Sequence, residues 1–84
     1  MGVQMKYQPR PEAMGRLDAA FKHHPPHGDQ AARYEVIRQK AWELGNLMLH
    51  LCPESRELSL ALTHLQQASQ WANCAIAVNE KPPA

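Results

Sequence analysis

The sequence predicts an all-α fold made of one short helix and one long antiparallel helical hairpin. Two nearly proline-free stretches, 30–51 and 53–79, carry apolar residues at steps of three and four, the spacing of a helix that lies along another helix. The Cys-Pro pair at 52–53 leaves almost no connecting chain between them, so the two helices must run antiparallel. The 84 residues suffice for one domain, which we expect over residues 12–80.

The N-terminal part predicts an arm, a short helix and a turn. Residues 1–11 contain two prolines and show no apolar periodicity, so we expect a flexible arm. A short helix is expected over residues 12–21. The adjacent prolines that follow exclude helix, and the stretch 25–28 is expected to form a rigid turn.

The first long helix is expected to begin after Asp29, because aspartate is a good N-cap residue. Its apolar seam consists of Tyr34, Ile37, Ala41, Leu44, Met48 and Leu51. Gly45 interrupts this helix at a cost of about 1 kcal/mol in helix propensity, which a close approach of the partner helix would explain.

The second long helix is expected to have Cys52 as its N-cap and Pro53 as its first residue, and to end near Asn79. One apolar stripe that can face the first helix comprises Leu58, Leu62, Leu65, Ser69, Ala72 and Ile76. A second stripe comprises Leu60, His64, Gln67, Trp71, Cys74 and Val78. Residues 81–84 are expected to form a disordered tail.

The two stripes predict self-association, because one partner helix cannot cover both faces of the second long helix. A chain of this size has a marginal core of its own and needs disulfides, a metal or partner subunits. Helical geometry places Cys52 and Cys74 roughly 30 Å apart, beyond disulfide reach, so both are expected to stay reduced. We therefore expect a compact homo-oligomer.

Charge and hydropathy argue against several classes of protein. The formal net charge is +1, which is too small for a protein that coats DNA or RNA. No apolar run approaches the ~20 residues that span a bilayer, and the first residues lack the apolar core of a signal peptide. We therefore expect an intracellular protein that contacts neither polymeric nucleic acid nor membrane.

The histidine-rich run FKHHPPHGDQ, residues 21–30, admits several chemical interpretations. His23, His24 and His27 could bind a metal, but no further soft ligand lies nearby in the sequence, so we expect no metal site. Cys52 beside His50 could suggest a nucleophile, although a helix cap explains Cys52 equally well. We expect no catalytic residues.

A third interpretation is an anion pocket. Helix N-termini offer free N–H groups and partial positive charge, and Arg33 and Arg56 lie near the two expected helix starts. Phe21 and Tyr34 could stack on a base. The alternative is that these arginines pair with Glu35, Glu54 or Glu57 on solvated faces.

Three runs carry a resemblance: FKHHPPHGDQAARYEVIR (21–38), CPESRELSLALTHL (52–65) and WANCAIAVNE (71–80). Together they resemble a bacteriophage family, the helical-hairpin domain shared by anti-CBASS and anti-Thoeris proteins. The resemblance covers about three quarters of the chain, and the short length is similar to that of the stand-alone anti-CBASS type.

The resemblance implies a sponge for cyclic nucleotide signals. Such proteins bind cyclic di- or trinucleotides, or cyclic ADP-ribose isomers, without cleaving them and without a cofactor. They act in the host cytoplasm and starve the effector of its activator. The family forms oligomers, often hexamers, with one pocket class between neighbouring chains and another on a threefold axis.

The resemblance also implies residue roles. Phe21 is expected to stack on a base, and His24 belongs to the same loop. Arg33 and Arg38 are candidates for phosphate contacts, and Ser55 and Arg56 for the threefold pocket. Trp71 is expected to anchor a neighbouring protomer, and Asn73 to be a buried hydrogen-bonding group.

Two alternatives lie outside the sponge interpretation. The first is a small helical structural or assembly protein that binds no ligand. The second is a metal-binding adaptor that uses His23, His24 and His27.

Overall fold

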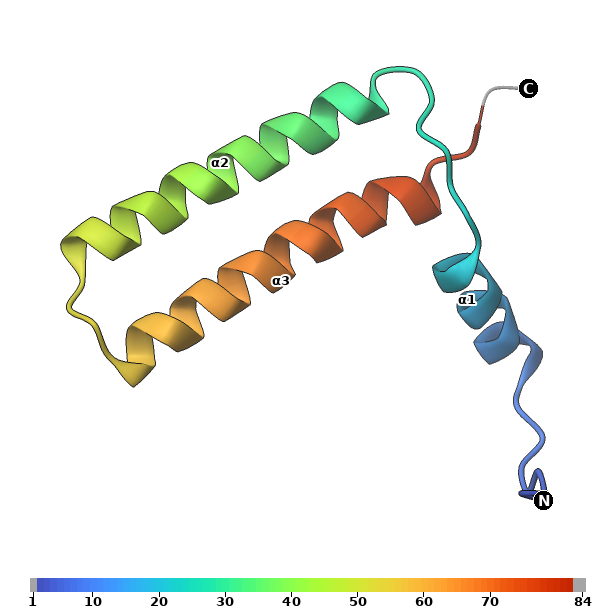
Figure 1. The fold of residues 1–84 in the computed structure, drawn as a ribbon. Coiled ribbons are helices and arrows are strands. Elements are labelled where there is room, and N and C mark those ends of the chain that lie inside the picture. Colours follow the sequence, from blue (N-terminus) through green and yellow to red (C-terminus); the bar gives the residue numbers. More distant parts are fainter. Residues whose placement is uncertain (1, 83–84) are drawn as a thin grey trace.

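The computed structural model describes residues 2–82, and within them it contains three α-helices and no strand (Figure 1). These are α1 (Pro11–Phe21), α2 (Gln30–Leu51) and α3 (Arg56–Asn79). Helices α2 and α3 lie side by side and antiparallel, while α1 lies beyond the open end of this hairpin (Figure 1). The predicted all-α hairpin is confirmed.

The first helix begins one residue earlier than predicted. Pro11 occupies its first turn, where a missing N–H costs nothing. Residues 2–10 form no regular secondary structure, and their flexibility stays a prediction. Residues 81–82 likewise lie outside any helix, whereas the rest of the predicted disordered tail, like residue 1, lies outside the described residues.

The start of α2 is confirmed, with Asp29 at the N-cap position. Its carboxylate, however, makes no capping bond to the helix backbone. Asp29 Oδ1 instead accepts a hydrogen bond from Arg33 Nε at 3.1 Å. The Asp29 side chain therefore pairs with Arg33 at the open end of the hairpin and does not cap α2.

The predicted start of α3 is wrong. The helix begins at Arg56, and Ser55 is its N-cap, with Oγ accepting the N–H of Leu58 at 3.1 Å. Cys52 is the C-cap of α2, where its N–H donates to the carbonyl of Met48. A serine hydroxyl is a far better acceptor for a helix N–H than a thiol, and the chain uses residues 52–55 to reverse direction.

The hairpin core is thin. Among the described residues, Leu58 is the one buried apolar side chain, with 7% of its surface exposed. The stripe of α3 that was predicted to face α2 is buried or half-buried along its whole length. Gly45 is buried where α2 lies against α3, but a Cβ added there would lie 3.4 Å from a methyl carbon of Leu65, an ordinary contact, so the helix approach alone does not require glycine.

The predicted seam of α2 is partly wrong. Tyr34, Ile37, Ala41 and Met48 are half-buried, but Leu44 and Leu51 are exposed. Leu51 is the last residue of α2 and lies at the closed tip of the hairpin. Two helices packed side by side bury only a narrow part of each helix surface, so apolar residues at the edges of the seam remain exposed to solvent.

The molecule is extended for its length. Its radius of gyration is 18.0 Å, and its extents are 49 × 41 × 22 Å. A compact chain of this length would have a radius of gyration of about 12 Å. The predicted compact oligomer concerns several copies of the chain and stays a prediction.

None of the helices within residues 2–82 is long and apolar enough to cross a membrane.

Candidate functional site

The loop of residues 22–29 connects α1 to α2 and passes close to the end of α3 (Figure 1). A cavity of about 270 Å³, called here the loop cavity, lies between this loop and α3. Its lining includes Lys22, His23, His24, His27, Val78 and Lys81. Basic and imidazole groups thus gather at the open end of the hairpin.

Two of the predicted ligand residues lie at the loop. His24 is half-buried, and its ring Nε2 lies 2.7 Å from the carbonyl oxygen of Ala19, so this nitrogen donates to the last turn of α1. Phe21 ends α1 and is 84% exposed, beside Leu17 and Lys22. The ring of Phe21 is therefore free to contact a ligand or a neighbouring chain.

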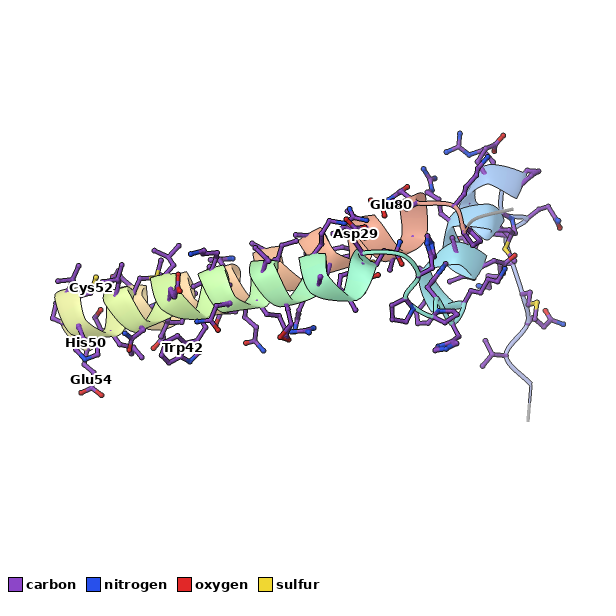
Figure 2. The ribbon with its side chains drawn as sticks, turned by 90° about the horizontal axis from the view of Figure 1, so that it is seen from above. Asp29, Trp42, His50, Cys52, Glu54 and Glu80 are labelled. Carbon is purple, nitrogen blue, oxygen red and sulfur yellow. The ribbon has the colours of Figure 1, made fainter. Side chains whose placement is uncertain are left out.

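Three side chains join the two long helices at the open end, and we call them the latch: Gln30, Arg33 and Glu80. Arg33 donates to both carboxylate oxygens of Glu80, from Nη1 to Oε2 at 2.7 Å and from Nη2 to Oε1. Gln30 Nε2 donates to Glu80 Oε1 at 3.0 Å. Figure 2 shows Glu80 at the same end of the hairpin as Asp29.

The latch perturbs the ionisation of its members. Hydrogen bonds from Arg33 and then Gln30 lower the pKa of the Glu80 carboxyl to about 2. The hydrogen bond to Glu80 raises the pKa of the Arg33 guanidinium further above its ordinary value. Both groups therefore stay charged at neutral pH.

Arg33 was predicted to contact phosphate, but in the structure carboxylates surround it. Asp29 and Glu80 both pair with its guanidinium. The alternative of an arginine paired with carboxylates thus holds for Arg33, although the partners differ from the expected Glu35, Glu54 and Glu57. The contact between Arg33 and phosphate stays a prediction.

Arg38 lies in the middle of the hairpin, away from the loop. It pairs with Glu35 at 2.6 Å and lines a groove of about 750 Å³ between α2 and α3, called here the hairpin groove. Trp42, Leu62 and Asn73 also line this groove, which the sequence did not predict. Asn73 Oδ1 is buried and has no hydrogen-bond partner within residues 2–82.

Ser55 and Arg56 lie at the closed tip of the hairpin. The Ser55 hydroxyl caps α3 and also donates to the carbonyl of Pro53 at 3.1 Å. Arg56 is exposed, and within the described part of the chain it forms no ion pair. Helix α3 has 24 residues. At ~1.5 Å per residue, roughly 35 Å therefore separates the tip from the loop within one chain.

The histidines of the loop do not converge on a metal position. Within residues 2–82, no group of three or more His, Cys, Asp or Glu side chains is arranged to hold a metal ion. Cys52 and Cys74 are both free. The geometry therefore gives no support to the metal-adaptor alternative.

Gln30 and Glu80 were missed by the sequence analysis. A signal for them existed, because an antiparallel hairpin brings the first turn of α2 to the end of α3. Arg33 then needs a counter-charge near residue 80. The register of the two helices, which decides this pairing, depends on how their side chains pack.

These features define a small all-α hairpin protein with candidate ligand residues at both ends and in a groove between its helices. The family model of the Acb2/Tad1 hairpin domain matches residues 14–77. The chain therefore belongs to the Acb2/Tad1 hairpin-domain family, the phage cyclic-nucleotide sponges, and the resemblance is confirmed. No curated protein and no solved structure matches the chain significantly.

Proposed function

We propose that this chain binds cyclic oligonucleotide immune signals in the cytoplasm of a phage-infected host and withholds them from CBASS- or Thoeris-type effectors. Its ligands are cyclic di- or trinucleotides, or cyclic ADP-ribose isomers. Membership in the sponge family over residues 14–77 carries the proposal. A sponge removes its ligand by binding alone, so the proposal needs no catalytic group and no cofactor.

The candidate residues supply the contacts that a cyclic nucleotide requires. Phe21 offers an exposed aromatic face for a base, and His24 fixes the adjoining loop against α1. Arg56, beside Ser55 at the tip, offers a guanidinium without a carboxylate partner in the described residues for a phosphate. Arg38 would act in the hairpin groove, where Glu35 already pairs with it.

The proposal includes a homo-oligomer, and a hexamer in particular. The isolated chain exposes 7518 Å². A compact monomer of its mass, 9.5 kDa, would expose about 5,000 Å². The excess, about 2,500 Å² per chain, suits the large interfaces of obligate assemblies.

Assembly would join residues that one chain keeps apart. The loop and the tip lie at opposite ends of the hairpin, so a pocket with contacts from both needs more than one copy (Figure 1). Two pocket classes, one near each end, would match this layout.

The test is calorimetric titration of the purified protein with a panel of cyclic di- and trinucleotides. Bound ligand is then released by heat and identified by mass spectrometry. We expect binding to at least one member of the panel and recovery of the intact molecule. A cleaved product would indicate a phosphodiesterase, and the absence of any binding at tens of micromolar would overturn the proposal.

Single substitutions assign the pockets. We expect Phe21→Ala to weaken binding at the loop and Arg56→Ala to weaken binding at the tip. Val36→Ala removes an exposed apolar side chain and Lys40→Ala a surface cation, and both are controls that leave binding unchanged. If Phe21→Ala and Arg56→Ala alter stability alone, the structural protein without a ligand is the better account.

A further inference from the structure

We propose that the latch of Gln30, Arg33 and Glu80 holds the loop of residues 22–29 in its ligand-ready position, and that Arg33 acts there as a positioning residue instead of a phosphate contact. As far as ligand binding is concerned, this inference rests on the proposed function. The fixing of the loop itself is independent of any ligand.

Gln30 connects the loop to the end of α3. It is 2% exposed, and both ends of its amide are bonded. Its Oε1 accepts the backbone N–H of His27 at 3.1 Å, while its Nε2 donates to Glu80. A buried amide with both ends satisfied has one favourable orientation, so the position of His27 follows that of Glu80.

Arg33 has few donors left for a ligand. Its Nε bonds Asp29, and its two terminal nitrogens bond Glu80. The cluster of Arg33, Asp29 and Glu80 carries one positive and two negative charges. An anionic ligand would meet a net negative cluster and would have to break an ion pair that engages both carboxylate oxygens.

Each of the two charges is unfavourably placed with respect to the dipole of its own helix. Arg33 lies near the N-terminus of α2, and Glu80 follows the C-terminus of α3. A cation at a helix N-terminus and an anion at a helix C-terminus both oppose the helix dipole. Pairing across the hairpin offsets both unfavourable interactions.

The loop has little else to fix it. Extensive helix packing within residues 2–82 is confined to α2 and α3, so α1 gives the loop weak support. Apart from the bond that His27 N–H donates to Gln30, two loop side chains make polar contacts: His24 bonds Ala19, which ties the loop to α1, and Asp29 accepts from Arg33, a member of the latch. Gln30 and Glu80 also line the loop cavity, so the latch shapes the space that the loop encloses.

The test uses Glu80→Gln, with Glu43→Gln as the matched control, since Glu43 is also paired, with Lys40 on the surface of α2. Hydrogen exchange of the backbone amides in residues 22–29 is followed without ligand. Charge-assisted hydrogen bonds are lost, so we expect the His27 amide to exchange about tenfold faster in Glu80→Gln and unchanged in Glu43→Gln. Glu80→Asp, which keeps the charge, should restore part of the protection.

Affinity for the cyclic nucleotide that the wild type binds gives the second readout. Glu80→Gln removes a negative charge, so a direct contact between Arg33 and phosphate predicts tighter binding. If Arg33 positions the loop, we expect Glu80→Gln to bind about fivefold more weakly than the wild type. The double variant Arg33→Met/Glu80→Gln should then bind no more weakly than Arg33→Met alone. Unchanged or tighter binding by Glu80→Gln would overturn the role of Arg33.

The two proposals fail in different ways. If the wild type binds no cyclic nucleotide but Glu80→Gln still loosens the loop, the proposed function is wrong and the latch stands as a device that fixes the loop. If loop exchange is the same in Glu80→Gln and the wild type, the latch is overturned whatever the protein binds.

Discussion

A few polar side chains decide how the helices of this protein end and meet. Ser55 caps the start of α3, and Glu80, just after its last residue, ties the far end to α2 through Gln30 and Arg33. The side chains of Arg33 and Glu80 are about two fifths exposed, so solvent screens their attraction. Their importance therefore lies in geometry, because the bidentate pair fixes one arrangement of two backbone segments.

Stability in acid tests the ion pair of Glu80. The folded pKa is about 2, against an ordinary value of 4.5, so the pair stabilises the protein fully above pH 4.5 and progressively less as the pH falls towards 2. We expect Glu80→Gln to be less stable than the wild type at neutral pH and to lose less stability below pH 4.5. The measurement is chemical denaturation followed by circular dichroism at several pH values.

Glu43→Gln provides the comparison for this acid effect. The hydrogen bond from Lys40 lowers the pKa of Glu43 as well, but less than that of Glu80. We therefore expect Glu43→Gln to change the loss of stability below pH 4.5 less than Glu80→Gln does. If the free energy of unfolding changes with pH in the same way in Glu80→Gln and in the wild type, the ion pair of Glu80 in the folded protein is contradicted.

The cap of α3 is tested by Ser55→Ala. The hydroxyl accepts the N–H of Leu58, and loss of an N-cap costs about 1 kcal/mol of stability. Ser59→Ala, an exposed change inside the same helix, should cost nothing or add a little stability, because alanine favours helix. Urea denaturation measures both, and an equal effect of the two variants would contradict the cap.

At the scale of elements, the packing of α2 on α3 depends on small and apolar residues at their contact. Gly45 lies against Leu62 and Leu65, and Leu58, in the first turn of α3, is buried. Helix α1 and the loop contribute little to this packing. The packing of the described residues is therefore concentrated in the hairpin, to which the latch ties the loop.

Gly45→Ala tests how tight this contact is. The added Cβ would lie 3.4 Å from Leu65 and 3.7 Å from Leu62, both ordinary contacts, so the helix keeps its place. We expect up to about 1 kcal/mol of added stability in urea denaturation, since alanine is the better helix former.

Gly15→Ala in α1 is the control for Gly45→Ala. A Cβ at Gly15 meets nothing within 4 Å, so this change should raise the helicity of α1 without stabilising the hairpin. A loss of stability in Gly45→Ala would mean that the helices approach each other more closely in the assembled protein than in the single chain.

At the scale of the whole molecule, the chain has more apolar surface than one hairpin can bury. Trp71 is 72% exposed on α3, and Trp42 is also exposed on α2 (Figure 2 labels Trp42). Side chains of this size rarely stay in water when another apolar surface is available. The extended shape, together with one buried leucine as the apolar core of residues 2–82, indicates that the isolated chain is marginally stable.

Trp71→Glu tests the proposed assembly. A charge in a desolvated interface is costly, so we expect the variant to sediment as smaller species than the wild type. Thr63→Glu places the same charge at an exposed polar position of the same helix and should leave the assembly intact. A wild type that sediments as a monomer would remove the basis for pockets between chains.

Local patterns were enough to predict the fold and the candidate residues. Apolar steps of three and four predicted two helices, the proline at 53 located the reversal, and three sequence runs identified the family. The same local reasoning misplaced the N-cap at Cys52, although Ser55 lay within the quoted motif. It left Phe21 and Arg56 as candidates whose roles depend on a ligand.

Helix, cap and turn propensities act over a few neighbouring residues, so the sequence alone determined a helical hairpin and its approximate bounds. The partner of Arg33 depends on the register of α2 against α3 across a separation of 47 residues, with eight acidic residues to choose from. Only the packed tertiary structure selects Glu80. The reason is physical: a long-range ion pair forms only after the burial of apolar side chains has set how the helices align.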